Sequence, residues 1–70
     1  MKYLEVVARK NGQTDRTRFH GWKLNEVKRI ALKTYGKEAD ISIFDHSNNA
    51  PYDFQMVALK YSGHVRFANI

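Results

Sequence analysis

The sequence predicts an α+β fold in which one helix packs on one face of a five-stranded antiparallel sheet, in the order β-β-α-β-β-β. Three observations predict it: an Asn-Gly turn at residues 11–12, one helical period that ends at Gly36, and three later alternating segments. Apolar–polar alternation is typical of strands with one covered face. A chain of 70 residues has room for one core, so a single domain over residues 1–70 is expected.

The first two strands are predicted over residues 2–9 and 14–20. Even-numbered apolar side chains of the first segment share one face, because strand side chains alternate. The Asn-Gly pair favours a type I′ turn, which needs positive φ at both central residues. Such a two-residue loop fixes the register and places Glu5 opposite Arg18. This attractive pair contributes about 0.2–1 kcal/mol.

The helix is predicted over residues 25–35. Its apolar arc at 100° per residue consists of Leu24, Val27, Ile30, Ala31, Thr34 and Tyr35. Asn25 is a candidate N-cap, whereas Lys23 in that role would place Glu26 at the third position of a capping box. Gly36 is expected to end the helix in a left-handed conformation.

Three further strands are predicted over residues 39–45, 54–61 and 65–70, with a polar loop over 46–53 and a three-residue loop over 62–64. The three-residue loop would place Val57, Leu59, Tyr61, Val65 and Phe67 on one face and Ala58, Lys60, Arg66 and Ala68 on the other. Ile41 and Ile43 are expected to point inward. The helix would cover one face of the sheet and leave the other to solvent or a partner.

The composition excludes several classes of protein. The chain has 12 Lys+Arg against 7 Asp+Glu, a net charge of +5, and no cysteine. A disulfide framework, a thiolate zinc site and a cysteine nucleophile are therefore excluded. With 43% apolar residues, the chain is too hydrophobic for a disordered basic tail. We recognise no membrane span and no secretory signal, so a small cytoplasmic domain is expected.

No arrangement of residues predicts catalysis. His20, His46 and His64 do not have the spacing of metal ligands, and His46 beside Asp45 is interpreted as a solvated turn. The glycines stand singly, so no phosphate loop is recognised. A sheet with one helical layer also lacks the depth for a pocket that excludes water. We therefore expect no enzyme activity, no metal and no cofactor.

The basic residues are more informative. The sheet face opposite the core is expected to carry Tyr3, Arg9, Arg16, Arg18 and His20, joined by Lys60, His64 and Arg66. Arginines interleaved with aromatic rings could hold phosphates and stack on bases. The same mixture suits a protein interface. An ordinary solvated face is an equally open interpretation.

The helix and its flank offer further candidate contacts. Lys28, Arg29 and Lys33 point away from the apolar arc, where a solvated helix face is the favoured interpretation. Trp22 is either an exposed aromatic anchor or a plug of the sheet–helix corner, and the plug is favoured. Phe44 is either a cover for the edge of the sheet or part of a binding patch.

A strand pair, the helix phrase Leu-Asn-Glu-Val-Lys-Arg-Ile-Ala-Leu-Lys at residues 24–33, and three later strands resemble small phage-encoded anti-CRISPR proteins, in particular type I-F inhibitors. The resemblance implies stoichiometric inhibition: such proteins dock on the repeated backbone subunit of the guide-RNA surveillance complex and obstruct pairing of target DNA. It implies contacts by Lys28, Arg29 and Lys33. Trp22 and the longer loop over 46–53 depart from the pattern. The layout also looks like phage inhibitors of bacterial RNA polymerase, whose acidic determinants this basic chain lacks.

The sequence thus predicts a non-enzymatic, phage-type inhibitor of a host nucleic-acid-handling complex, most concretely a CRISPR surveillance complex. The expected contacts are Arg16, Arg18, Lys28, Arg29, Lys33 and Arg66, with apolar area from Tyr3, Val7 and Trp22. One alternative is a direct nucleic-acid-binding domain of low sequence specificity; another is an inhibitor of host RNA polymerase. A virion component that assembles through its sheet edge is a further alternative. Monomer and homodimer both remain open.

Overall fold

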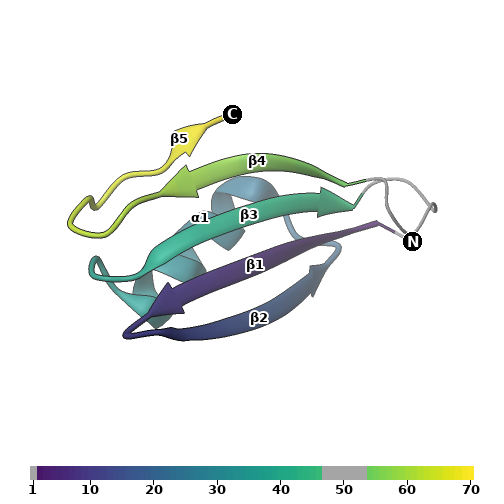
Figure 1. The fold of residues 1–70 in the computed structure, drawn as a ribbon. Helices are drawn as coiled ribbons and strands as arrows, with labels where there is room; N and C mark the ends of the chain where they lie inside the picture. Colours follow the sequence, from purple (N-terminus) through teal and green to yellow (C-terminus); the bar gives the residue numbers. More distant parts are fainter. Residues whose placement is uncertain (1, 47–53) are drawn as a thin grey trace.

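The computed structural model describes residues 2–46 and 54–70 and has the predicted α+β architecture (Figure 1). Its elements are β1 (Tyr3–Lys10), β2 (Gln13–His20), α1 (Leu24–Tyr35), β3 (Asp40–His46), β4 (Gln55–Lys60) and β5 (Ala68–Asn69). The strands form one sheet in the order β2-β1-β3-β4-β5, and every neighbouring pair is antiparallel. The helix therefore connects two strands that lie on either side of β1.

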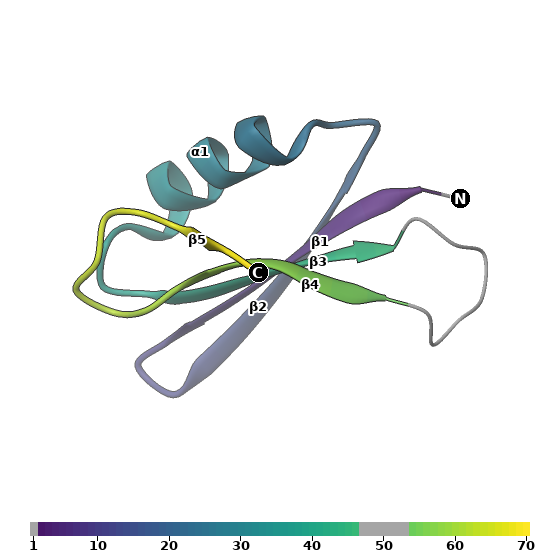
Figure 2. The same ribbon diagram turned by 90° about the horizontal axis from the view of Figure 1, so that it is seen from above.

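The helix covers one face of the sheet and leaves the opposite face open (Figure 2). The core between the two layers consists of Leu4, Val6, Ala8, Val27, Ala31, Ala39, Ile41, Ile43 and Ala58. Phe19 and Tyr35 pack against this core from its margin. Thr34, which the helical period placed in the apolar arc, is exposed instead, because only the central stripe of the helix reaches the sheet.

The first hairpin has the predicted turn and register. Asn11 and Gly12 have φ values of 54° and 78°, as a type I′ turn requires. Glu5 lies opposite Arg18 and Leu4 opposite Phe19. Both strands also extend by one residue toward the turn, so Gln13 follows it directly.

The helix begins one residue earlier than predicted. Lys23, not Asn25, is its N-cap, and the Lys23 carbonyl accepts hydrogen bonds from the N–H groups of Glu26 and Val27. Gly36 ends the helix with φ 78° and donates its N–H to the Leu32 carbonyl. Its ψ of −179° is extended rather than left-handed helical, which turns the chain directly toward β3.

The C-terminal hairpin differs from the prediction. The strand predicted over 65–70 shrinks to β5. Leu59 pairs with Ala68, whereas the predicted three-residue loop places it opposite Phe67. The connecting segment instead leaves the sheet, since the N–H of Gly63 donates to the Lys37 carbonyl after α1. A local turn forms, since the N–H of His64 donates to the Tyr61 carbonyl, but the tertiary hydrogen bond of Gly63 holds this turn against the segment after α1.

A β-bulge interrupts the alternation of β4. Ile43 pairs with Ala58, but the next residue, Phe44, pairs with Met56, so Val57 is the extra residue. Met56 and Phe44 therefore share the open face, while Ala58 lies inward in the core. Strict alternation, which placed Val57 and Leu59 together, fails at this bulge.

Lys60 is buried on the helix side, contrary to its predicted place on the basic open face. It is 1% exposed, and its Nζ donates to the carbonyls of Lys37 at 2.9 Å and Ala39 at 2.8 Å. Burial lowers the pKa of Lys60, and nearby Asp40 partly opposes that shift. The ammonium thus fastens the α1–β3 connection to the end of β4.

Within residues 2–46 and 54–70, no helix combines the length and the apolar character that crossing a membrane requires. The segment predicted as a polar loop lies largely outside the described residues, except for His46, which is the last residue of β3.

Candidate binding surface on the open sheet face

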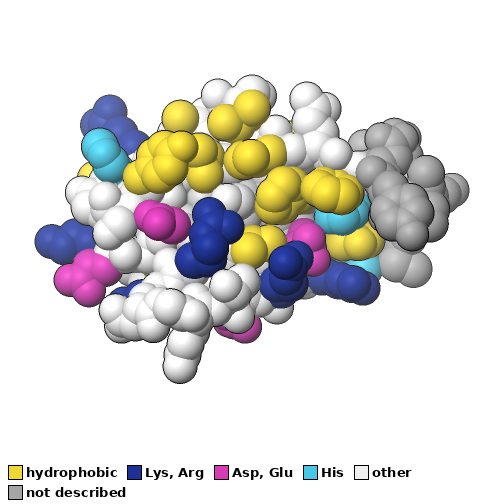
Figure 3. Space-filling view, viewed as in Figure 1, with side chains coloured by type: hydrophobic (Ala, Val, Ile, Leu, Met, Phe, Trp, Pro, Cys, Tyr) yellow, Lys and Arg dark blue, Asp and Glu magenta, His cyan; other side chains and the backbone are white. Residues whose placement is uncertain are grey.

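The open face is formed by side chains that alternate away from the helix on four strands. Its members are Tyr3, Glu5, Val7 and Arg9 from β1, Thr14, Arg16, Arg18 and His20 from β2, Asp40, Ser42, Phe44 and His46 from β3, and Met56 and Leu59 from β4. Lys and Arg side chains gather over β1 and β2, whereas hydrophobic side chains gather over β3 and β4 (Figure 3). The surface is therefore divided into a basic half and an apolar half.

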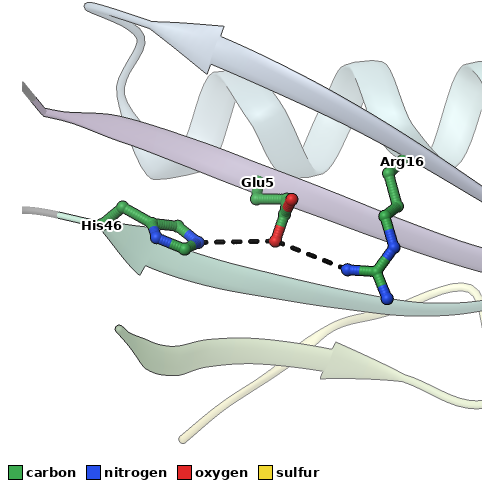
Figure 4. Close-up of polar contacts among 3 residues, drawn as sticks. All are labelled: Glu5, Arg16 and His46. Carbon is green, nitrogen blue, oxygen red and sulfur yellow. Dashed lines mark ion pairs between the residues drawn. The ribbon is translucent and has the colours of Figure 1, made fainter. Parts of the chain in front are cut away.

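Glu5 lies between the two halves and contacts both (Figure 4). Its Oε1 is 3.8 Å from Nη1 of Arg16 and 3.4 Å from Nε2 of His46. The Glu5 and His46 side chains are only 14% and 13% exposed, whereas Arg16 is 66% exposed. The backbone register pairs Glu5 with Arg18, but the carboxylate turns to the diagonal neighbour Arg16.

Arg18 instead lies over the ring of Tyr3, with its guanidinium carbon 5.2 Å from the ring centroid. Such a cation–π contact contributes about 0.5–1 kcal/mol at an exposed site. Arg9 donates to the hydroxyl of Ser42 at 3.2 Å and so connects β1 with β3. Arg16 has a long contact of 3.8 Å with Glu5 and stays 66% exposed.

A row of rings crosses the sheet at the end where β1 begins. Tyr3 stacks on His46 with centroids 4.5 Å apart and planes at 9°, and His46 stacks on Phe54 at 5.2 Å and 25°. His20 approaches Tyr3 from β2 at 5.1 Å, and Phe44 meets Phe54 edge-on at 5.3 Å. These spacings are close to the separation of neighbouring strands, about 4.7–4.9 Å.

The stacking decides what the row can bind. Tyr3 is covered by His46 on one side and by Arg18 and His20 on the other, while His46 lies between Tyr3 and Phe54. Tyr3 and His46 therefore show solvent their edges rather than their faces. A nucleobase needs an open ring face for stacking. The row is therefore better suited to contact with protein side chains.

His46 contains an unusual polar atom. Its Nε2 is fully buried and makes no hydrogen bond to any residue of the described ranges, although the Glu5 carboxylate lies nearby. His46 was expected in a solvated turn beside Asp45. Because adjacent strand residues point to opposite faces, the two side chains separate across β3.

The candidate residues from the sequence fall on two opposite faces. Tyr3, Arg16 and Arg18 come together on the open face. On the helix, Arg29 and Lys33 are exposed, while Lys28 is half-buried and donates to Asn69 Oδ1 of β5. Arg66 is exposed in the connection between β4 and β5, outside any strand.

Trp22 is 46% exposed and therefore does not plug the corner of the sheet and helix as favoured from the sequence. Its ring meets Phe19 edge-on, with centroids 5.9 Å apart. It forms one wall of a cleft of about 440 Å³ that Leu4, Leu24 and Asp45 also line. Trp22 is thus available to a partner that reaches this end of the sheet.

Sequence reasoning missed His46, Phe54 and Met56 as members of the open face. For His46 a signal was available, because the outward alternation through Phe44 continues to His46 if the strand is one residue longer. For Met56 and Phe54 no local signal existed, since the bulge at Val57 sets their side of the sheet.

Comparison of the chain with protein-family models, with curated proteins and with solved structures finds no match.

Proposed function

We propose that this protein is a non-catalytic binding protein that docks through its open sheet face on a protein of a host nucleic-acid-handling assembly. The row of stacked rings beside exposed arginines is the observation that carries the proposal. The ring faces of Tyr3 and His46 at its centre are occupied, so these two rings offer a partner their edges and apolar area. Aromatic residues, methionine and arginine are enriched in protein interfaces.

The arrangement also fits the anatomy of an interface. Half-buried rings lie in the middle of the row, and Arg16 and Phe54 are exposed at 66% and 49%. A rim of positive charge beside apolar area steers an acidic partner and fixes its orientation. The net charge of +5 acts in the same direction over a longer range.

The helix phrase that resembles anti-CRISPR proteins makes the CRISPR surveillance complex the partner to test first. That resemblance implies contact by the helix, whereas the ring geometry favours the sheet. Because the two faces lie on opposite sides of the molecule, one flat contact cannot use both. The two alternatives therefore make opposite predictions for charge reversal.

Direct binding to nucleic acid is the second candidate. Its support is the alignment of Arg9, Arg16 and Arg18 on one half of the open face, which could follow a phosphate backbone. Such binding would weaken steeply with salt, with a slope close to the number of phosphates contacted.

The test uses two matched double variants of the full chain. Arg16→Glu with Arg18→Glu alters the sheet face, and Arg29→Glu with Lys33→Glu alters the helix face; each pair consists of two Arg/Lys-to-Glu reversals. Binding is measured to purified surveillance complex and to naked single- and double-stranded DNA and RNA. We expect the sheet pair to weaken binding to the complex by about tenfold or more, which is about 1.4 kcal/mol, and the helix pair to change it little.

Other results would overturn the proposal. A loss confined to the helix pair would transfer the docking surface to the helix. Tight, salt-dependent binding of the unaltered protein to naked strands would favour direct nucleic-acid binding. A pull-down from bacterial lysate that recovers neither CRISPR nor transcription subunits would exclude the proposed class of partner.

A further inference from the structure

The outer edge of the sheet at β2 is long and open. Within the described part of the chain, β2 pairs with β1 alone, and all eight of its residues are exposed or half-exposed. Lys10 and Gln13 flank the two-residue turn and so form a hydrogen-bonded pair, after which hydrogen-bonded and non-bonded pairs alternate. The backbone N–H and C=O groups of Thr14, Arg16, Arg18 and His20 consequently point toward the free edge.

The same alternate residues carry their side chains on the open face. A strand added along this edge would pair its backbone with Arg16 and Arg18 and place side chains beside both guanidinium groups. On the helix side, it would meet the half-buried Thr17 and Phe19. The edge therefore presents Arg16 and Arg18 to an added strand on the open face, and on the helix side Asp15, Thr17 and the apolar Phe19.

A second copy of this chain is a poor occupant. Two copies could pair through β2 as antiparallel strands related by a two-fold axis, with both open faces on the same side of the joined sheet. If the axis passed at Arg16 or Arg18, that arginine would lie opposite its own copy. If the axis passed at Thr17, Arg16 would lie opposite Arg18 of the other copy. Like charges directly opposite each other destabilise a strand pair, and charged edge strands resist association with one another.

We propose that the β2 edge accepts, as an added strand, an extended segment of a partner protein in which acidic residues alternate with apolar ones. This inference rests on the proposed protein-docking function and specifies the partner's chemistry. Backbone hydrogen bonds supply affinity, and alternate side chains supply specificity. Acidic residues lie opposite Arg16 and Arg18, and apolar residues lie toward Thr17 and Phe19.

Arg16 is available for this role. Its contact with Glu5 spans 3.8 Å and leaves the side chain 66% exposed, so a carboxylate on an added strand could form a shorter pair. Arg18 keeps its guanidinium over Tyr3, which orients it on the same face. The added strand would extend the sheet beside the ring row, so both surfaces would belong to one interface.

The test uses three synthetic peptides of equal length and the full-length protein. The first alternates glutamate and valine, the second replaces each glutamate by lysine, and the third keeps the first sequence but carries N-methyl groups on alternate backbone amides. Binding is followed by fluorescence polarisation and by backbone amide NMR shifts. We expect only the first peptide to bind well, with the largest shifts over residues 13–20.

A backbone variant tests the edge itself. Thr14→Pro removes an N–H that faces solvent and leaves the β1 pairing intact, whereas Thr14→Val keeps that N–H. We expect Thr14→Pro to weaken binding of the acidic peptide about fivefold, the effect of one hydrogen bond, and Thr14→Val to leave it unchanged. The NMR spectrum of each variant confirms that it is folded.

The outcomes separate this inference from the proposed function. Equal binding of the N-methylated peptide would show attraction by charge alone and would overturn strand addition. Docking on the surveillance complex that is unaffected by Thr14→Pro would overturn it while the proposed function stands. A concentration-dependent doubling of mass in ultracentrifugation that Thr14→Pro abolishes would identify a second copy as the occupant and overturn the acidic partner.

Discussion

The two edges of this sheet are built in opposite ways. At one edge, β5 has only two residues, its Asn69 accepts a hydrogen bond from Lys28 of the helix, and the N–H of Ile70 donates to Val57. Nearby, Lys60 fastens the end of β4 to the α1–β3 connection. At the other edge, β2 extends over eight residues beside a single neighbour. We call the β5 edge the closed edge and the β2 edge the open edge.

The difference shows two solutions to one problem. Unpaired backbone groups at a sheet edge attract other strands, and proteins avoid this by shortening an edge or by placing charge on it. The closed edge is short and held by polar side chains, while the open edge keeps its length and carries Arg16 and Arg18. If the proposed strand addition holds, the open edge keeps its length for the partner, and its charge limits which strands can pair with it.

The largest expected effect comes from breaking the closed edge at Lys60. Lys60→Met keeps the apolar stem but leaves the carbonyls of Lys37 and Ala39 without their charged donor. We expect the free energy of unfolding to fall by about 2–3 kcal/mol, measured by urea denaturation. Lys37→Met, at an exposed site, is the control and should change it by less than about 0.5 kcal/mol. Equal stability of the two variants would contradict a structural role for the buried ammonium.

An intermediate effect on stability is expected where the helix contacts β2 at the open edge. The hydroxyl of Tyr35 donates to Asp15 Oδ2 at 2.7 Å and lies 3.1 Å from the hydroxyl of Thr17, which joins the helix to β2. Tyr35→Phe removes both bonds and should cost about 1 kcal/mol. Amide hydrogen exchange in β2 should accelerate more than in β4; uniform acceleration would show that Tyr35 does not hold β2 specifically.

Tyr35 also makes the free energy of unfolding depend on pH. Burial, with a further contribution from Asp15, raises the pKa of Tyr35 above its ordinary value of 10.0. The folded state then holds a proton that the unfolded state loses, so the Tyr35 contribution is present below pH 10 and is lost as the pH rises through the folded pKa.

Lys60 changes the free energy of unfolding with pH in the opposite direction, so the contributions of Lys60 and Tyr35 can be measured separately. Its lowered pKa means that the folded state binds fewer protons just below 10.5, so its effect on stability rises with pH there. In urea midpoints measured across about pH 9–11, Tyr35→Phe should leave only the Lys60 rise. A decline with pH that survives this substitution would assign the alkaline loss to another group.

The smallest effect on stability is expected where Lys28 contacts β5 at the closed edge. Asn69→Ala removes the acceptor of Lys28, and this exposed contact should contribute less than about 0.5 kcal/mol. The measurable change should be faster amide exchange at Ile70, because β5 loses its link to the helix. No change in that exchange would show that the pairing of β5 with β4 is sufficient.

Local rules predicted the first hairpin closely. The Asn-Gly turn sets the register of β1 and β2 through short-range geometry, and the hydrophobic period places the helix within one residue. The later strands could not be placed the same way. The bulge at Val57 and the hydrogen bond from Gly63 to Lys37 depend on contacts between distant segments. The prediction for Lys60 failed for a similar reason, since only the folded chain brings the carbonyls of Lys37 and Ala39 to its ammonium.

The candidate site was predicted in part. Alternation with the hairpin register was enough to bring Tyr3, Arg16 and Arg18 onto one face. The orientation of the rings was not accessible, because stacking depends on which side chains meet across strands that are distant in sequence. That orientation is also the observation on which the proposal of a protein partner rests.

Trp22 follows β2 closely and is the only tryptophan of the chain. Trp22 is 46% exposed, and its ring packs edge-on against Phe19 at the end of the open edge. Indole emission depends strongly on hydration, so this position makes the native protein its own fluorescent reporter. A strand that covers the last residues of β2 would exclude water from the indole of Trp22 and shift its emission to shorter wavelength. Neither molecule would need a label.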